Sequence, residues 1–162
     1  MKKLMLLTLI AVMGIGISCK AQSPKASAEG KGVKVTYGQP SKKGREIFGG
    51  LEPYGKVWRA GANNATEITF EKDSKFGGKD IKAGTYTLFV TPNPNEWTVI
   101  LNSELKQWGA FKYEEIKGKD VLHVTVPVKK LDAVVEKLTY RFTDKNALVI
   151  EWDQSQITVP IQ

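Results

Sequence analysis

The chain has 162 residues and a formal net charge of +7; 41% of its residues are hydrophobic and 25% are charged. This is the composition of a globular protein, and the length allows one domain, or one domain and a leader. With one cysteine and one histidine, the sequence excludes a disulfide within the chain and a zinc site of the Cys/His type.

Residues 1–18 have the pattern of a secretory signal peptide. Lys2 and Lys3 precede an apolar stretch over residues 4–17, which is shorter than the roughly 20 residues that cross a bilayer. The alternative, a buried core helix, does not account for two lysines at the extreme N-terminus directly before an apolar run. We therefore expect the protein to be exported from the cytoplasm.

The leader ends in Gly16-Ile17-Ser18-Cys19, which resembles a bacterial lipobox, where small residues precede an obligatory cysteine. In that pathway the cysteine sulfur receives a diacylglycerol, and cleavage makes the cysteine the mature N-terminus. We expect lipid attachment at Cys19, because a free thiol would be a liability in an oxidising compartment. The expected location is the periplasmic face of the outer membrane. The competing interpretation is cleavage after Ala21, which would leave a soluble periplasmic protein.

Residues 19–32 are mostly Ser, Ala, Gly, Lys and Gln without an apolar period, which predicts a flexible tether. The lysines are scattered, and the chain has only three arginines, Arg45, Arg59 and Arg141. Nucleic-acid sites favour clustered arginines beside aromatic platforms, so nucleic acid is not an expected partner. The excess positive charge indicates a basic surface that faces anionic lipid or glycan.

From residue 33 onward, apolar and polar side chains alternate with the period of a strand that has one buried face. The strands predicted in this way cover residues 33–37, 67–71, 138–143, 148–153 and 157–161. Residues 85–91 and 97–102 are partly apolar on both faces, which predicts central strands, and 121–126 is another strand. Residues 131–137 offer a possible short helical turn.

Turn signals separate these strands. Gly77-Gly78 indicates a hairpin between Phe76 and Ile81, and residues 144–146 indicate another between two strongly alternating strands. About eight or nine short strands with turns every 8–12 residues predict an all-β fold. We therefore expect a single antiparallel β-sandwich or jelly-roll-like domain over residues 33–162.

Residues 44–64 depart from the strand pattern, because they combine glycine, aromatic residues and two of the three arginines. The glycines indicate backbone at positive φ or close approach of one chain segment to another. An elaborate loop in a small domain is typically functional or a packed Ω-loop. We expect this segment to fold over one end of the sandwich.

The segments 37–70, 83–89 (AGTYTLF), 96–100 (EWTVI) and 107–110 (QWGA) together resemble a known family. The chain is similar to the domain of unknown function 2911 family of bacterial envelope proteins, from about residue 33 to residue 162. The resemblance implies a secreted, all-β envelope domain with no established activity.

Aromatic residues beside arginine and asparagine are typical of sites that bind sugars or the polar ends of ligands. The candidate ligand-binding residues are Arg45, Trp58, Arg59, Asn63 and Trp108. The competing interpretation is that the tryptophans fill the core and that Arg59 pairs with a glutamate such as Glu67.

The sequence therefore favours a binding module for a glycan, a peptide or a small polar ligand over an enzyme. The first alternative is a structural or assembly partner in an envelope complex. The second is a carboxylate-dependent hydrolase, which would draw on the glutamates of this region. These glutamates are Glu46, Glu52, Glu67 and Glu71.

No metal or cofactor is expected, because Asn93, Asn95 and Glu96 are too few for the usual acidic ligand set of calcium. His123 alternates with apolar neighbours in its strand and has no nucleophile nearby in the sequence. We expect His123 on the surface, without a catalytic role.

Overall fold

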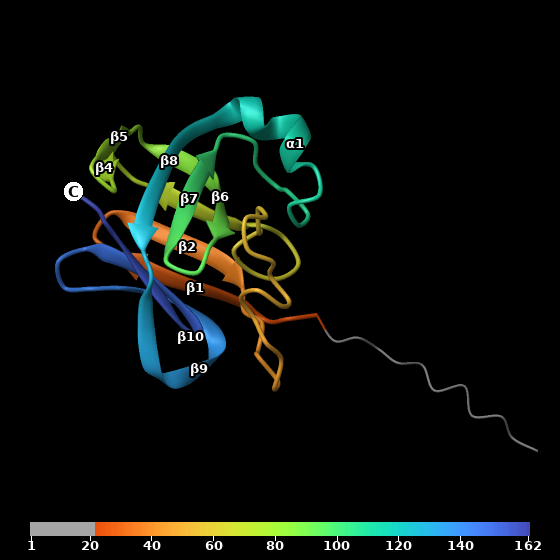
Figure 1. The fold of residues 1–162 in the computed structure, drawn as a ribbon. Helices are drawn as coiled ribbons and strands as arrows, with labels where there is room; N and C mark the ends of the chain where they lie inside the picture. The colour runs from red at the N-terminus through yellow and green to blue at the C-terminus, as the bar shows by residue number, and fades with distance from the viewer. Residues whose placement is uncertain (1–21) are drawn as a thin grey trace, which may run out of the picture.

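The computed structural model describes residues 22–162, so the predicted signal peptide and Cys19 lie outside the described residues. The described chain is built almost entirely of antiparallel strands (Figure 1). The elements are β1 (Lys25–Gly30), β2 (Val33–Gly38), β3 (Thr66–Phe70), β4 (Ser74–Phe76), β5 (Lys79–Ile81), β6 (Gly84–Pro92), β7 (Glu96–Asn102), α1 (Tyr113–Ile116), the 3-10 turn η1 (Lys117–Lys119), β8 (Asp120–Pro127), β9 (Lys129–Phe142) and β10 (Ala147–Pro160).

The main sheet has six strands in the order β1-β2-β3-β6-β7-β8, so each strand pairs with the next strand of this sheet along the chain. The β4–β5 hairpin lies between β3 and β6 in the sequence and forms a separate two-stranded sheet. The β9–β10 hairpin forms a second layer; β9 contacts β1, and β10 contacts β8 and β4. The predicted all-β, sandwich-like fold is confirmed. β6 and β7 lie inside the sheet, as their apolar content on both faces predicts.

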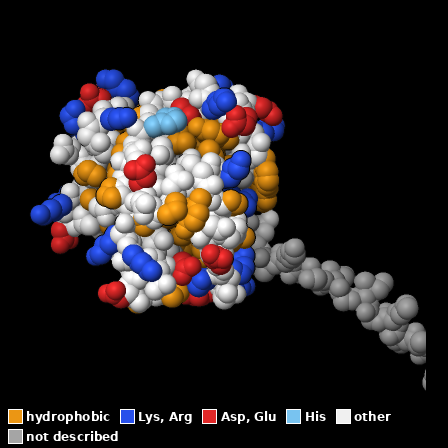
Figure 2. Space-filling model, viewed as in Figure 1, with side chains coloured by type: hydrophobic (Ala, Val, Ile, Leu, Met, Phe, Trp, Pro, Cys, Tyr) orange, Lys and Arg blue, Asp and Glu red, His pale blue; other side chains and the backbone are white. Residues whose placement is uncertain are grey.

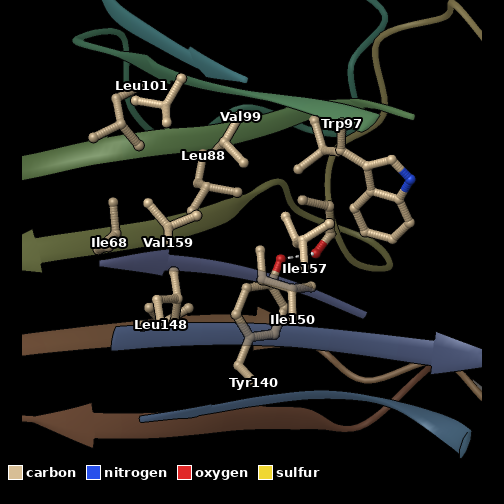
Figure 3. Packing of buried hydrophobic residues seen from close by; sticks show 14 of the residues in the cluster. Ile68, Leu88, Trp97, Val99, Leu101, Tyr140, Leu148, Ile150, Ile157 and Val159 are labelled. Carbon is tan, nitrogen blue, oxygen red and sulfur yellow. Dashed lines mark hydrogen bonds between the residues drawn. The ribbon is translucent and has the colours of Figure 1, made fainter. Parts of the chain in front are cut away.

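The core lies between the main sheet and the β9–β10 hairpin. Figure 3 shows Ile68, Leu88 and Val99 of the sheet facing Ile150 and other side chains of the hairpin. Each of these side chains is fully buried, and burial of one such side chain stabilises the fold by about 1.5–3 kcal/mol. Strand alternation therefore directs the polar face of each outer strand to solvent, as predicted.

The flexible tether predicted over residues 19–32 is wrong over Lys25–Gly30, which forms β1. Every residue of β1 pairs with β2, from Lys25 opposite Gly38 to Gly30 opposite Val33. Ala26 and Ala28 pack against the core from this edge strand. The small side chains carry little hydrophobic signal, and backbone pairing with β2 holds the strand in place.

The helical turn predicted over residues 131–137 is also wrong, because this segment is part of the long strand β9. The helical turns lie instead at α1 and η1, before β8. The two strands predicted over 148–153 and 157–161 belong to one strand, β10, whose pairing with β9 shifts register around Asp153. Asp153 has a φ of 54°, which marks the irregularity.

A second, smaller cluster covers the outer face of β6 and β7. Phe89 and Ile100 project from that face and contact Ala65 and Tyr113, so α1 is held against the sheet. This packing brings the segment between β7 and α1 next to the segment between β2 and β3. The candidate site lies where these two segments meet.

Candidate functional site

The glycine-rich segment between β2 and β3 folds back onto the main sheet. Trp58 and Val90 exchange two backbone hydrogen bonds, of 2.7 and 3.0 Å, so the segment runs beside β6. The N–H of Ala62 donates to the carbonyl oxygen of Gly38 at 3.2 Å. A Cβ atom on Gly38 would lie 2.0 Å from the Ala62 carbonyl oxygen, so glycine is required for this approach.

Trp58 belongs to the core, which corrects the expectation that it faces a ligand. It is only 3% exposed, and its ring stacks on Trp152 with centroids 6.0 Å apart and planes inclined by 20°. Trp97 and Phe48 meet it edge-on. The indole Nε1 of Trp58 is buried without a hydrogen-bond partner among the described residues. Aromatic packing therefore explains Trp58.

Arg45 bonds to the backbone of its own turn. Its guanidinium donates to the backbone carbonyl oxygens of Ser41 at 2.7 Å and Lys42 at 3.0 Å. The Lys42 ammonium donates to the carbonyl oxygen of Arg45 and, at 2.9 Å, to Asp153. These bonds close the turn over residues 41–45, and Arg45 does not share the hydrogen bonds that join Arg59 to Asn63.

Arg59, Asn63 and Trp108 do come together. The Arg59 guanidinium donates to the carbonyl oxygen of Asn63 at 3.2 Å, and the N–H of Gly109 donates to the same oxygen at 3.1 Å. Trp108 pairs through its backbone with Asn64. The structure thus joins the two segments at adjacent positions, although 45 residues separate Asn63 from Trp108 in the numbering.

A pocket of about 480 Å³ lies beside this junction. Its lining combines the aromatic side chain of Trp108, neutral amides, two lysines (Lys25 and Lys106) and one acidic residue, Glu67. The lining residues are Gln22, Ser23, Lys25, Thr36, Tyr37, Gly38, Ala62, Asn63, Asn64, Ala65, Glu67, Lys106 and Trp108. Sequence reasoning missed the contribution of residues 22–25, because it assigned them to a tether.

Trp108 is 56% exposed, whereas Trp58, Trp97 and Trp152 are each at most 3% exposed. The chain has four tryptophans, and Trp108 is the one whose indole is exposed at the surface. An indole offers a flat apolar face and one N–H donor, which suits the face of a sugar ring or another partly polar ligand. The pocket therefore has one exposed aromatic wall beside several amide side chains.

The family model for proteins of unknown function called DUF2911 matches residues 19–161. The chain belongs to the DUF2911 family. The resemblance that the sequence motifs carry is thus confirmed. No curated protein and no solved structure gives a significant match to the chain.

The glutamates of this DUF2911 domain do not gather in the pocket, because Glu67 is the only acidic residue in the pocket lining. Its carboxylate accepts the backbone N–H of Lys106 at 3.0 Å, and no ion pair of the described residues joins it to Arg59. The anticipated Arg59–Glu67 pair is therefore absent. A carboxylate-dependent hydrolase needs two carboxylates across a cleft, whereas this pocket contains one, that of Glu67.

Glu52 is the most perturbed carboxyl group of the DUF2911 domain. Burial raises the pKa of Glu52 from its usual 4.5 to about 7, and the charges of Arg59 and Arg45 lower it without offsetting the burial. Both arginines thus lie within electrostatic reach of one half-buried carboxyl group. Glu52, the carboxyl group that both arginines influence, is not part of the pocket lining.

His123 has a partner that its sequence neighbourhood did not reveal. Its Nε2 lies 2.9 Å from a carboxylate oxygen of Asp120, which also accepts the hydroxyl of Tyr113 at 2.6 Å. The other oxygen of Asp120 accepts the amide of Asn102 at 2.7 Å. Burial raises the pKa of the Tyr113 hydroxyl, so it remains a donor at neutral pH.

The predicted outward direction of His123 is confirmed, since its side chain is half exposed and appears in pale blue on the surface (Figure 2). Asp120 organises a structural network in which His123 occupies the solvent side. Within residues 22–162, no three His, Cys, Asp or Glu side chains group closely enough to hold a metal ion. No helix in that range is long and apolar enough to cross a membrane.

Proposed function

We propose that the chain is an exported, lipid-anchored envelope protein that binds a glycan, a peptide or another small polar ligand in the pocket beside Trp108. The observation that carries the proposal is the position of Trp108, an exposed indole at the mouth of a pocket lined by amide side chains. The proposal is of a non-catalytic binding module on the periplasmic side of the outer membrane.

The arrangement of polar groups supports a ligand with hydroxyl or amide groups. Asn64 and Lys106 supply exposed donors at the rim, and Glu67 supplies an acceptor. Sites for small molecules typically combine an apolar wall with a few polar groups that fix the orientation of the ligand. A sugar ring fits this description, because its apolar face stacks on an indole while its hydroxyls reach the amides.

The anchor part of the proposal rests on the leader and on Cys19. The family match begins at residue 19, so the signal-like segment lies outside the part that the chain shares with its family. Labelling of growing cells with a fatty-acid probe is expected to mark the full chain and not Cys19→Ser. Equal labelling of both chains, or of neither, would contradict the lipid anchor.

Binding is tested with residues 20–162, which include both layers of the fold and the pocket. A panel of envelope glycans and peptides is titrated into the protein by calorimetry, and a ligand is expected to bind in the micromolar to millimolar range. Trp108→Ala and Asn64→Ala should each weaken that ligand at least tenfold. Val134→Ser, which changes an exposed residue of β9, is the matched control and should bind as the original chain does.

A ligand whose affinity is unchanged by Trp108→Ala would contradict the proposed site. If instead purified envelope proteins are captured by a surface that includes Trp108, the alternative of an assembly partner gains support.

A further inference from the structure

The loop between β7 and α1 exposes two large aromatic side chains. Trp108 is 56% exposed and Phe111 is 80% exposed, the highest value among the large hydrophobic residues of the described chain. We call this pair the aromatic edge. The Phe111 ring lies over Gly109, where a Cβ atom would come within 2.7 Å of the ring. A side chain at position 109 would thus collide with this ring, which is itself exposed to solvent.

Water solvates this arrangement poorly, and exposed aromatic groups on a soluble domain typically mark a contact surface. Figure 2 shows apolar side chains along the right-hand side of the molecule. Phe111 does not line the pocket. Binding of a small ligand in the pocket would thus leave the exposure of Phe111 unexplained.

Positive charge accompanies the aromatic edge. Lys106 and Lys112 lie in the same loop and are exposed, and Lys25 is an exposed residue of the pocket lining. Among the acidic groups close by in the sequence or the pocket, Glu67 accepts the backbone N–H of Lys106, Glu114 pairs with Lys117, and Glu115 is exposed. Lysines beside exposed aromatic rings suit a surface with phosphate groups above a hydrocarbon layer.

The lipid anchor proposed above would place the same edge near a membrane. Ser23 lines the pocket, and its carbonyl oxygen accepts the side-chain amide of Asn63 at 3.0 Å. Cys19 precedes Ser23 by four residues, and four residues span at most about 14 Å. A lipid on Cys19 would therefore hold Ser23, at the pocket beside this edge, within about 14 Å of the lipid-bearing cysteine.

We propose that the aromatic edge contacts the bilayer surface directly, with Phe111 and Trp108 in the interface between headgroups and acyl chains and the three lysines against anionic phospholipid. Indole and phenyl rings favour this interface, because it offers an apolar side and a hydrated side. The orientation argument rests on the lipid anchor proposed above. The contact itself is a property of the folded domain and needs no anchor.

Vesicle sedimentation tests the contact without the anchor. The chain of residues 20–162 lacks the apolar leader and Cys19, and the residues that form the core lie within it. It is expected to sediment with vesicles of phosphatidylglycerol and phosphatidylcholine, and less with pure phosphatidylcholine or at high salt. Trp108 fluorescence is expected to shift to shorter wavelength on binding.

The decisive comparison is between Phe111→Ser and the control Val134→Ser, which removes an exposed apolar side chain from β9. Phe111→Ser should weaken vesicle binding about tenfold, and Val134→Ser should leave it unchanged. Melting curves of both variants should match that of the unaltered domain, since neither side chain is buried. Absence of vesicle binding, or equal binding by Phe111→Ser, would overturn the proposal.

The same variants separate this proposal from ligand binding in the pocket. Phe111→Ser changes no residue of the pocket lining, so it should bind the polar ligand as the unaltered domain does. Loss of vesicle binding with ligand binding intact supports both proposals. Vesicle binding by a domain that binds no ligand of the panel would support the membrane contact alone.

Discussion

The side-chain amide of Asn63 donates a hydrogen bond to the backbone carbonyl oxygen of Ser23 at 3.0 Å, which ties the glycine-rich segment to the start of the domain. Asn63 has a φ of 63°, in the left-handed region that asparagine tolerates better than most residues. Its carbonyl oxygen accepts from Arg59 and Gly109. Asn63 thus connects three segments that meet at the pocket.

Arg59→Ala is expected to lower the free energy of unfolding by about 1–2 kcal/mol, because it removes one half-buried hydrogen bond and a favourable charge near Glu52. Urea denaturation measures the loss, with Arg59→Lys as a variant that keeps the charge. A loss of roughly 3–5 kcal/mol would contradict this reading and would indicate that Arg59 neutralises a buried carboxylate.

Glu52 is expected to make stability depend on pH. Its pKa is about 7 in the folded state against 4.5 ordinarily, so the folded state favours the protonated form. The contribution of Glu52 to stability is greatest below pH 4.5 and is lost as the pH rises through 7. Because the group is partly exposed, we expect a total effect of about 1–2 kcal/mol.

Glu52→Gln removes this titration. The variant should be more stable than the original chain at pH 8, and the gain should shrink towards pH 4.5. Denaturation curves at several pH values measure the difference, and Glu46→Gln, which changes an exposed glutamate of the same segment, is the control. A constant difference across this pH range would show that Glu52 is not the titrating group.

Asp120 and His123 should differ sharply in their effect on stability. Asp120→Ala leaves the hydroxyl of Tyr113 without its acceptor and removes one of the two acceptors of the Asn102 amide, at an expected cost of about 2–3 kcal/mol. His123→Gln alters a half-exposed partner and should change stability by less than about 1 kcal/mol. Similar losses in both variants would contradict this assignment of roles.

Gly38 should not tolerate a side chain. Alanine at this position would place Cβ 2.0 Å from the carbonyl oxygen of Ala62, so β2 and the glycine-rich segment would have to separate. The expected cost is at least about 2 kcal/mol. Gly118→Ala is the matched control, because a Cβ atom at Gly118 meets nothing within 4 Å. Equal thermal stability of the two variants would refute the close approach.

The strands of the main sheet could be predicted because their side chains alternate between core and solvent. Val33 and Val35 are buried while Lys34 between them is exposed. The alternation of apolar and polar residues in the sequence shows this pattern directly. β1 lacks it, since Ala26 and Ala28 are small and the strand is held by backbone hydrogen bonds to β2. The prediction of a helical turn over residues 131–137 was wrong for a related reason. Val134 and its neighbours are largely exposed in β9, so their sequence lacks the alternation of a half-buried strand.

The candidate site could be predicted only in part. Trp58 stands between Val57 and Arg59, and Trp108 stands between Gln107 and Gly109. Neither setting separates a core tryptophan from an exposed one. The difference arises from packing: Trp58 stacks on Trp152, whereas Trp108 lies exposed in the loop between β7 and α1. The contribution of Lys106 and Ser23 depends on the register of distant segments, which a single sequence does not specify.

The most direct test of the pocket is the set of indole N–H signals in a nitrogen-15 NMR spectrum of residues 20–162. Four signals are expected, one for each tryptophan, and Trp108→Phe assigns the exposed one. When a binding glycan or peptide is added, we predict that the Trp108 signal moves while those of Trp58, Trp97 and Trp152 stay in place. A ligand that leaves the Trp108 signal unmoved would contradict the proposed site.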